Sequence, residues 1–201
     1  MNTLESLAPE DLGSAAQRDR RRRILDATIA LASKGGFDAV QMRNVADLAD
    51  VALGTLYRYF PSKIHLLVSA LGRQFEQAEA TLREKPIPGD NPSERVIFVL
   101  KKTTRGLQGD PHLTEALTRA FMFADASVAP EIHKVGMLMT AMLTHAMDPE
   151  RTTEVTDDDV AIARVIGDVW LSALVAWVTG RSTAAEPAQH METAVRMLLR
   201  D

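Results

Sequence analysis

Apolar residues recur along the chain at the spacing of amphipathic helices, and no stretch alternates apolar and polar positions as a half-buried strand does. The first helix is predicted over residues 15–34, and Gly35 and Gly36 are expected to end it, because glycine is favoured just after a helix. The apolar stripe of this helix consists of Leu25, Thr28, Ile29 and Ala32. The fold class is therefore predicted to be all-α.

Turn residues divide the rest of the chain into further helices. Two short helices are predicted over residues 42–49 and 53–59, and Pro61 and Ser62 separate the second one from a longer helix over residues 63–84. The apolar face of that longer helix consists of Leu67, Leu71, Phe75, Ala78 and Leu82. Prolines and a glycine then break the chain. The later helices are expected over residues 93–108, 111–124, 126–147, 157–179 and 186–200.

Positive charge is concentrated in one part of the chain. The net charge is −4, yet residues 15–65 hold nine Lys and Arg against five Asp and Glu, whereas residues 1–14 and 66–201 are both acidic. A basic block on an acidic chain indicates one surface for a polyanion and a separate body with another task. We predict a flexible arm at residues 1–14, a DNA-binding domain at 15–65 and a second domain at 66–201.

The composition argues against several classes of protein. Cysteine is absent, so neither a disulfide framework nor a thiolate metal site can form. The first residues lack the apolar run of a signal peptide, and the longest apolar stretch, residues 169–178, is shorter than the roughly 20 residues that span a bilayer. We expect a cytoplasmic protein with no metal, no cofactor and no contact with a membrane.

Residues 40–63 carry the candidate chemistry. Two short helices joined by a tight turn at Asp50 and Val51 form a helix-turn-helix, whose second helix can lie in the major groove of DNA. Mostly small apolar side chains on the inner side let two such helices pack closely. The positions predicted to face inward are Val45, Ala46, Ala49, Val51 and Leu56.

The outward positions of this motif suit DNA. An exposed glycine lets the backbone approach DNA closely, arginine pairs with guanine, and hydroxyl or ammonium groups bind phosphate. The run of arginines at residues 20–23 can follow the DNA backbone or enter the minor groove, and a solvated helix face is the alternative. The predicted DNA-binding residues are Arg20, Arg22, Arg43, Gly54, Thr55, Tyr57, Arg58, Tyr59 and Lys63.

The motif continues over a long, specific block. It reads MRNVADLADVAL followed directly by GTLYRYFPSK, after a Gly-Gly-Phe turn. This block resembles the DNA-binding region of the TetR family of repressors, over roughly residues 18–70. The resemblance implies an all-α homodimer of about nine helices, in which the first three bind an inverted repeat of double-stranded DNA and the others bind a small ligand and dimerise. Two residues depart from the family pattern: Gln41 replaces a capping Ser or Thr, and Ile64 replaces an acid.

Four further blocks extend the resemblance. They read RRRRILDATIALASKGGFDAVQMR, SKIHLLVSALGR, LTEALTRAFMFADAS and ARVIGDVWLSALVAWVT. They are similar to the actinobacterial repressors of cholesterol catabolism within this family. The similarity implies a repressor of sterol-degradation genes that is released from its operator by an apolar effector, a steroid-derived acyl-CoA thioester. A TetR-type regulator of another lipid or efflux pathway, a DNA-binding protein without a ligand, and an activator remain alternatives.

Large apolar side chains in the second domain are candidates for a ligand pocket, because methionine and aromatic residues suit accommodating apolar sites. The predicted ligand-binding residues are Phe98, Leu117, Phe121, Met137, Met142, Trp170, Leu174 and Trp177. For any single one of them, an ordinary core position is the alternative.

The helix over residues 157–179 is apolar on two faces, which indicates burial on both sides. We predict that one face lines the pocket and that the other meets a second subunit, with a central core helix as the alternative. The face assigned to the second subunit consists of Ile162, Ile166, Val169, Ala173 and Ala176. The next helix, the ninth, is expected to complete a four-helix homodimer contact through Met191, Ala194, Val195 and Leu198.

An enzyme is the main rival class. The five histidines form no HExxH or ExxH pair, and the chain has neither a Gly-rich phosphate loop nor a GxSxG motif. The lone pair Glu186 and His190 is weak, so no catalytic residue is predicted. As a hypothesis, the ligand acts through the helix over residues 63–84, which begins at the DNA surface and runs into the second domain.

Overall fold

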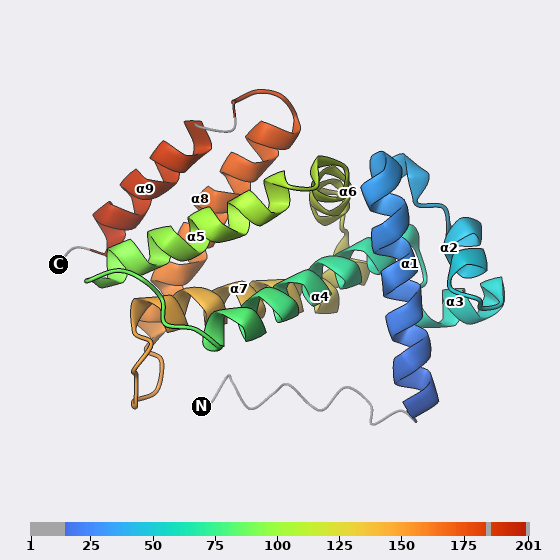
Figure 1. The fold of residues 1–201 in the computed structure, drawn as a ribbon, viewed down its shortest axis with the longest axis horizontal. Helices are drawn as coiled ribbons and strands as arrows, with labels where there is room; N and C mark the ends of the chain where they lie inside the picture. Colours follow the sequence, from blue (N-terminus) through green and yellow to red (C-terminus); the bar gives the residue numbers. More distant parts are fainter. Residues whose placement is uncertain (1–14, 184–185, 200–201) are drawn as a thin grey trace.

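The computed structural model describes residues 15–183 and 186–199, and these residues form nine α-helices, one 3-10 helix and no strand (Figure 1). The predicted all-α fold is confirmed, whereas the predicted arm at residues 1–14 lies outside the described residues. The helices are α1 (Ala15–Ala39), α2 (Met42–Leu48), α3 (Leu53–Tyr59), α4 (Lys63–Arg83), α5 (Pro92–Gln108), α6 (Pro111–Met122), η1 (Ala126–Val128), α7 (Ala129–Met147), α8 (Asp157–Val178) and α9 (Glu186–Leu198).

A break near the end of α1 positions the small domain. Gly35 and Gly36 both leave helical geometry, and Gly36 has a φ of 67°, in the left-handed region that favours glycine. The regular part of α1 thus stops where the sequence predicted, and one further helical turn follows up to Ala39. The change of direction brings α2 and α3 beside α1, at one end of the molecule (Figure 1).

Helix α4 connects this small domain to the rest of the chain. The Ser62 hydroxyl accepts a hydrogen bond from the His65 N–H at 3.4 Å, which caps the helix as its sequence predicts. The helix then runs away from α1 and packs against α6 and α7 (Figure 1). The boundary predicted between residues 65 and 66 therefore falls inside a continuous helix.

The helix predicted over residues 126–147 is split, and the one before it is shorter than predicted. Phe123 leaves helical geometry, and Asp125 then caps the 3-10 turn by accepting a hydrogen bond from the Ser127 N–H at 2.9 Å. Pro130 stands in the first turn of α7, where a residue without an N–H leaves no helical bond unmade. A local cap and a proline together override the apolar periodicity that suggested one helix.

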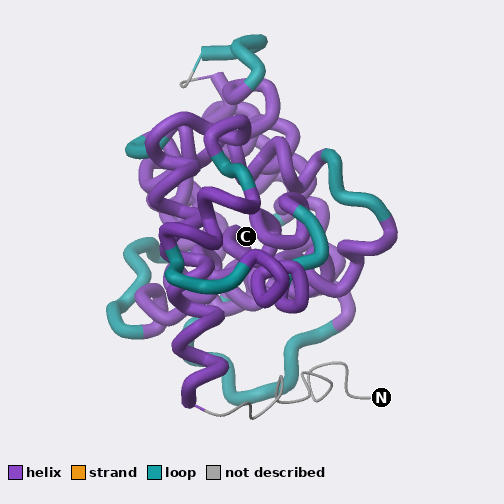
Figure 2. The backbone as a smooth tube through the Cα atoms, turned by 90° about the vertical axis from the view of Figure 1, so that its right-hand side faces the viewer, coloured by secondary structure: helices purple, strands orange, loops and turns teal. Residues whose placement is uncertain are grey.

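The second domain is a bundle in which α8 contacts α6, α7 and α9, while α5 packs on α7 and α9. Figure 2 shows helices throughout this body, with loops only at the connections. A reciprocal capping box starts α8: the Thr156 hydroxyl accepts from the Asp159 N–H, and the Asp159 carboxylate accepts from the Thr156 N–H, both at 3.1 Å. Arg151 also donates to that carboxylate, at 2.7 Å. These contacts fix the start of α8.

Candidate DNA-binding surface and ligand cavity

The helix-turn-helix is held together by its small apolar residues. Val45, Ala46 and Leu56 are fully or almost fully buried between α1, α2 and α3, as predicted. The turn between α2 and α3 includes Asp50, a non-glycine residue with a φ of 52°. Arg23 supports this turn from α1, because its guanidinium donates to the carbonyl oxygens of Ala49 at 2.5 Å and Asp50 at 3.3 Å.

Five of the residues predicted to contact DNA lie on the outer side of α2 and α3. Arg43, Tyr57 and Arg58 are exposed, and Thr55 is partly exposed. Gly54 is exposed too, its backbone is not in the left-handed region, and a Cβ atom there would meet nothing within 4 Å. Neither packing nor backbone geometry therefore requires a glycine at this position. A close approach by another molecule would explain why the residue has no side chain.

Tyr59 and Lys63 both lie partly against the protein. Tyr59 is half-buried against the core, with its ring centroid 6.4 Å from that of Phe60. The Lys63 ammonium lies 3.9 Å from the centroid of the Phe37 ring, and partial burial lowers the pKa of this lysine. Its contact with phosphate stays a prediction, and binding DNA would draw the ammonium away from an aromatic face.

The arginines at the start of α1 divide into two groups. Arg21 lies over the Phe60 ring, 5.6 Å from its centroid, and so faces the small domain, as Arg23 does. Arg20 is partly exposed and Arg22 is exposed. Arg22 forms a surface ion pair with Asp19 at 2.5 Å, and such an exposed pair is weak enough for a phosphate to compete with it. Arg20 and Arg22 are therefore the two of these arginines still available for DNA.

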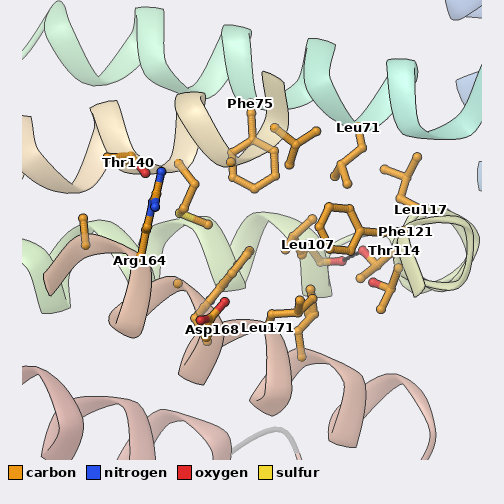
Figure 3. A pocket seen from close by; sticks show the side chains of 18 residues that line it. Leu71, Phe75, Leu107, Thr114, Leu117, Phe121, Thr140, Arg164, Asp168 and Leu171 are labelled. Carbon is orange, nitrogen blue, oxygen red and sulfur yellow. Dashed lines mark hydrogen bonds between the residues drawn. The ribbon is translucent and has the colours of Figure 1, made fainter. Parts of the chain in front are cut away.

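A cavity of about 220 Å³ lies between α4, α6, α7 and α8, with one contribution from α5 (Figure 3). Its lining is mostly apolar. The lining residues are Leu71, Phe75, Leu107, Thr114, Leu117, Thr118, Phe121, Val135, Gly136, Met139, Thr140, Ala163, Arg164, Gly167, Asp168, Trp170, Leu171 and Leu174. Trp170 is fixed on two sides, because its indole N–H donates to the Thr104 hydroxyl at 2.9 Å and its ring meets Phe75 edge-on at 6.2 Å.

The structure brings some of the predicted ligand-binding residues together and leaves others apart. Four of them line this cavity, namely Leu117, Phe121, Trp170 and Leu174, and Met142 lines a neighbouring one. Phe98, Met137 and Trp177 line neither of these two cavities, so their contact with a ligand stays a prediction. On α5 the residues on either side of Phe98 are buried, and Phe98 itself points outward with 37% of its surface exposed.

Met137 and Trp177 miss the cavity for two different reasons. Met137 lies on α7 between Gly136 and Met139, which do line the cavity, but each step along a helix rotates the side chain by about 100°. Trp177 lies near the end of α8, beyond Leu174, and packs against the core instead. Residue type suggested Phe98 and Met137, whose helix faces turn them away from the cavity. Trp177 lies on the same apolar face of α8 as Trp170 and Leu174, but beyond the end of the cavity.

Two charged residues at the cavity were not predicted. Arg164 and Asp168, one turn apart on α8, are exposed yet contribute to the lining, and Figure 3 shows Arg164 extending toward Thr140 of α7. The sequence could have identified them by their positions on α8. Ala163 and Gly167, which precede them by one residue each, line the same cavity. They mark the edge at which the cavity reaches the surface between α7 and α8.

Helix α6 joins the cavity to the small domain. Its face with Thr114, Leu117 and Phe121 lines the cavity, while its Glu115 carboxylate accepts a hydrogen bond from the Phe37 N–H of α1 at 2.8 Å. Arg119, one turn on, lies 4.5 Å from the centroid of the Phe37 ring. Its guanidinium is 3.5 Å from the Glu115 carboxylate and 3.7 Å from that of Asp38.

The outer surface of α8 differs from the predicted subunit face. Ile166 is fully buried inside the chain, and the exposed stripe consists of Ala161, Val165, Asp168 and Ser172. On α9, Met191 and Val195 are likewise buried against the body, and the exposed apolar residues are Met197 and Leu198. Each apolar stripe is thus only partly covered within one chain, because Ile162, Val169 and Ala173 stay partly exposed.

Helix α8 is long and apolar enough to cross a membrane, by length and composition alone. The prediction that no segment reaches that length considered only the uninterrupted apolar run at residues 169–178, which is shorter than a membrane span. Core helices of soluble proteins meet the same criterion. Only 28% of its most apolar stretch is buried in the single chain, so this helix keeps apolar surface uncovered.

Two family models match the chain, and together they cover most of it. The model described as "Bacterial regulatory proteins, tetR family" matches residues 24–70, which hold the helix-turn-helix. The model described as "Tetracyclin repressor-like, C-terminal domain" matches residues 89–198, which hold α5 to α9.

Curated relatives match almost the whole chain. The HTH-type transcriptional repressor KstR of Rhodococcus jostii is 59% identical over 98% of this chain and 90% of its own length. The protein of the same name from Mycobacterium tuberculosis is 54% identical over 97% of this chain and 87% of its own length.

Solved structures agree with the fold. A TetR transcriptional regulator from Rhodococcus sp. RHA1 has a TM-score of 0.84 at 31% identity, covering 92% of this chain and 98% of its own. Thermus thermophilus FadR, a repressor in complex with lauroyl-CoA, has a TM-score of 0.72 at 19% identity, covering 89% of this chain and 93% of its own, and this likeness concerns the fold alone.

Proposed function

Because this chain belongs to the TetR family of bacterial regulatory proteins, which are DNA-binding regulators and not enzymes, we propose that it represses sterol-degradation genes and is released from its operator by a steroid-derived acyl-CoA thioester. The full-length similarity to repressors named KstR supports the repressor function. The observation that carries the choice of ligand is the apolar cavity inside the second domain, which suits a fused-ring hydrocarbon better than a charged effector. A DNA-binding regulator of this kind acts on the chromosome, in the cytoplasm.

The DNA-binding domain of this proposal is residues 15–65, and residues 66–201 form the ligand-binding and dimerisation domain. Exposed Arg43 and Arg58 are the candidates for reading base edges, and Arg20 and Arg22 are candidates for the phosphate backbone or the minor groove. Gly54, with open space around it, lets the start of α3 approach the DNA closely.

The homodimer forms through α8 and α9 in this proposal, with the contact on the exposed stripe. Val165 is 47% exposed on α8 and Met197 is 61% exposed on α9, which suits an apolar contact between two copies. Val165→Asp should therefore give a monomer by sedimentation, whereas Met122→Asp, a similarly exposed methionine on α6, should leave the dimer intact. A dimer that survives Val165→Asp would rule out this interface.

In this proposal, ligand binding in the cavity affects the DNA-binding domain through two helices. Helix α4 lines the cavity with Leu71 and Phe75 and begins at Lys63, beside α3. Helix α6 lines it with Leu117 and bonds α1 through Glu115. A ligand that favours another position of these helices lowers operator affinity by its preference for that state.

The test is fluorescence anisotropy of a labelled duplex from the gene's own upstream region. We expect tight, salt-sensitive binding of the protein to an inverted repeat, reversed by a cholesterol-derived acyl-CoA thioester. If a fatty acyl-CoA released the protein from the duplex and the sterol thioester did not, the proposed effector would be wrong and the repressor function would stand. Absence of specific binding to any inverted repeat would contradict the whole proposal.

A further inference from the structure

A second cavity, of about 340 Å³, lies beside the first one. It opens between α4 and α5, which follow each other in sequence but diverge in space (Figure 1). The residues that belong to both linings are Leu71, Phe75, Leu107, Thr114 and Leu117. Because these shared side chains form the wall between the two spaces, a ligand too long for the first cavity can continue into the second when they change rotamer.

The two cavities differ in chemistry. The wall of the second one includes Gln74, Gln77 and Thr103, so amide and hydroxyl groups line it along with apolar side chains. Its charged lining residues are Lys102 of α5 and Asp110. The Asp110 carboxylate caps α6 by accepting a hydrogen bond from the Leu113 N–H at 3.0 Å, so part of its charge is already engaged.

Positive charge is available at this opening. Lys102 lines the second cavity, and Arg105, which does not line it, is exposed one turn further along α5. No ion pair within 4.0 Å joins either of them to another described residue. Their neighbour Lys101 differs, because it is paired with Glu192 of α9. An anion that leaves the second cavity therefore meets two cations without a competing carboxylate pair.

The opposite edge of the first cavity is less suitable for a polar tail. It reaches the surface at Arg164 and Asp168 of α8, and Asp168 belongs to the exposed stripe that also holds Val165. In the α8–α9 homodimer a second copy covers this stripe. A bulky tail that left the first cavity here would meet the partner.

Size supports the same path. Ligand pockets for drug-sized molecules measure roughly 300–1,000 Å³, and the first cavity, at about 220 Å³, is smaller than that. Joined to the second, of about 340 Å³, it falls within the range. An acyl-CoA thioester also needs two environments, because its acyl part is apolar, its pantetheine arm carries amides, and its phosphates are anionic.

We propose that the second cavity, with Gln74, Gln77, Lys102 and Thr103, is an α4–α5 subsite that holds the pantetheine arm of the thioester and leads its phosphates to Lys102 and Arg105. This inference rests on the proposed function, since it assigns the polar half of the same effector. The acyl part fills the first cavity, and the amide side chains of Gln74 and Gln77 meet the amides of the arm.

The test compares two probes by titration calorimetry: the CoA thioester of a cholesterol-derived acid and the same acid without CoA. Lys102→Glu should weaken binding of the thioester by about tenfold and leave the free acid within about twofold, because only the thioester brings phosphates to this position. The matched control is Lys85→Glu, an exposed lysine beyond the end of α4 and outside both linings, which should change neither affinity.

A second variant blocks the subsite by volume. Gly106 lines it, and a Cβ atom there would meet nothing within 4 Å, so the position accepts a side chain. Gly106→Trp should therefore reduce the space of the subsite and weaken thioester binding more than acid binding. Equal losses for both probes, or equal effects of Lys102→Glu and Lys85→Glu, would overturn the subsite. If neither probe bound the unmodified protein, the proposed effector itself would be wrong.

Discussion

The contact between α6 and α1 allows a quantitative test of how the cavity communicates with DNA. The Glu115 carboxylate accepts the Phe37 N–H at 2.8 Å, directly after Gly36, and its other oxygen lies 3.5 Å from Arg119. Glu115→Gln keeps an oxygen acceptor of similar reach and removes the charge. A hydrogen bond to a charged group contributes about 1.5–3 kcal/mol and a neutral one about 1 kcal/mol, so the substitution should weaken this link by about 1 kcal/mol.

This energy translates into a measurable loss of coupling. Effectors typically change the affinity of a second site by about 5–150-fold, and about 1 kcal/mol corresponds to about fivefold. In Glu115→Gln, the ratio of operator affinity without and with effector should therefore fall by up to about fivefold. Because coupling is reciprocal, the ratio of effector affinity without and with operator should fall by the same factor.

Anisotropy of labelled operator at several effector concentrations gives both ratios. Glu84→Gln is the matched control, because Glu84 is exposed at the far end of α4 from α1 and should leave the ratios unchanged. Thermal unfolding separates a loss of coupling from a loss of folded protein. A ratio in Glu115→Gln equal to that of the unmodified protein would show that α6 does not carry the signal through this bond.

Three other substitutions test separate parts of the structure. Gly54→Ala should stabilise the exposed start of α3 by about 0.5–1 kcal/mol in urea unfolding yet weaken operator binding, and unimpaired binding would mean that DNA does not approach this glycine. Trp170→Phe removes the 2.9 Å bond to Thr104, so it should cost about 1 kcal/mol of stability and weaken effector binding while sparing operator binding. An unchanged effector affinity would make Trp170 a core residue only. Burial opposes ionisation of Asp159, but hydrogen bonds from Thr156 and Arg151 outweigh it and lower its pKa. Its stabilisation is therefore present above the ordinary carboxyl pKa and lost on acidification, so Asp159→Asn should lower stability by about 1 kcal/mol near neutral pH and by less near pH 3, followed by thermal scans. A difference independent of pH would exclude the charge as the cause.

Signals that act within a few residues predicted the helices well. Ser62 accepts the hydrogen bond that starts α4, and the departure of Gly36 into the left-handed region interrupts α1 where the sequence placed its end. The helix-turn-helix was equally predictable from the sequence, because a tight turn and mostly small apolar side chains specify it locally. Gln41, which replaces the capping Ser or Thr of the family pattern, makes no capping hydrogen bond with its side chain.

The cavity was less predictable because it depends on which apolar surface stays unfilled. Periodicity shows that a face of α8 is apolar, and Trp170 and Leu174 of that face line the first cavity. It does not show whether a neighbouring helix fills the space in front of that face. Phe98 was chosen for its aromatic ring, yet its position on α5 turns it outward. The same limit applies to α9, whose stripe with Met191 and Val195 is covered by the chain itself.

Helix α6 shows most clearly what local patterns cannot assign. In the sequence, Glu115 and Arg119 have the spacing of an ordinary exposed ion pair, and that alone would contribute little. Their partner Phe37 is 78 positions from Glu115, so only the folded chain brings these residues together. One helix then has a face on the ligand cavity and a face on the DNA-binding domain. A ligand that moves α6 through Leu117 would therefore either strain the bond between Glu115 and Phe37 or move α1 with it, and both outcomes would change how the helix-turn-helix meets DNA.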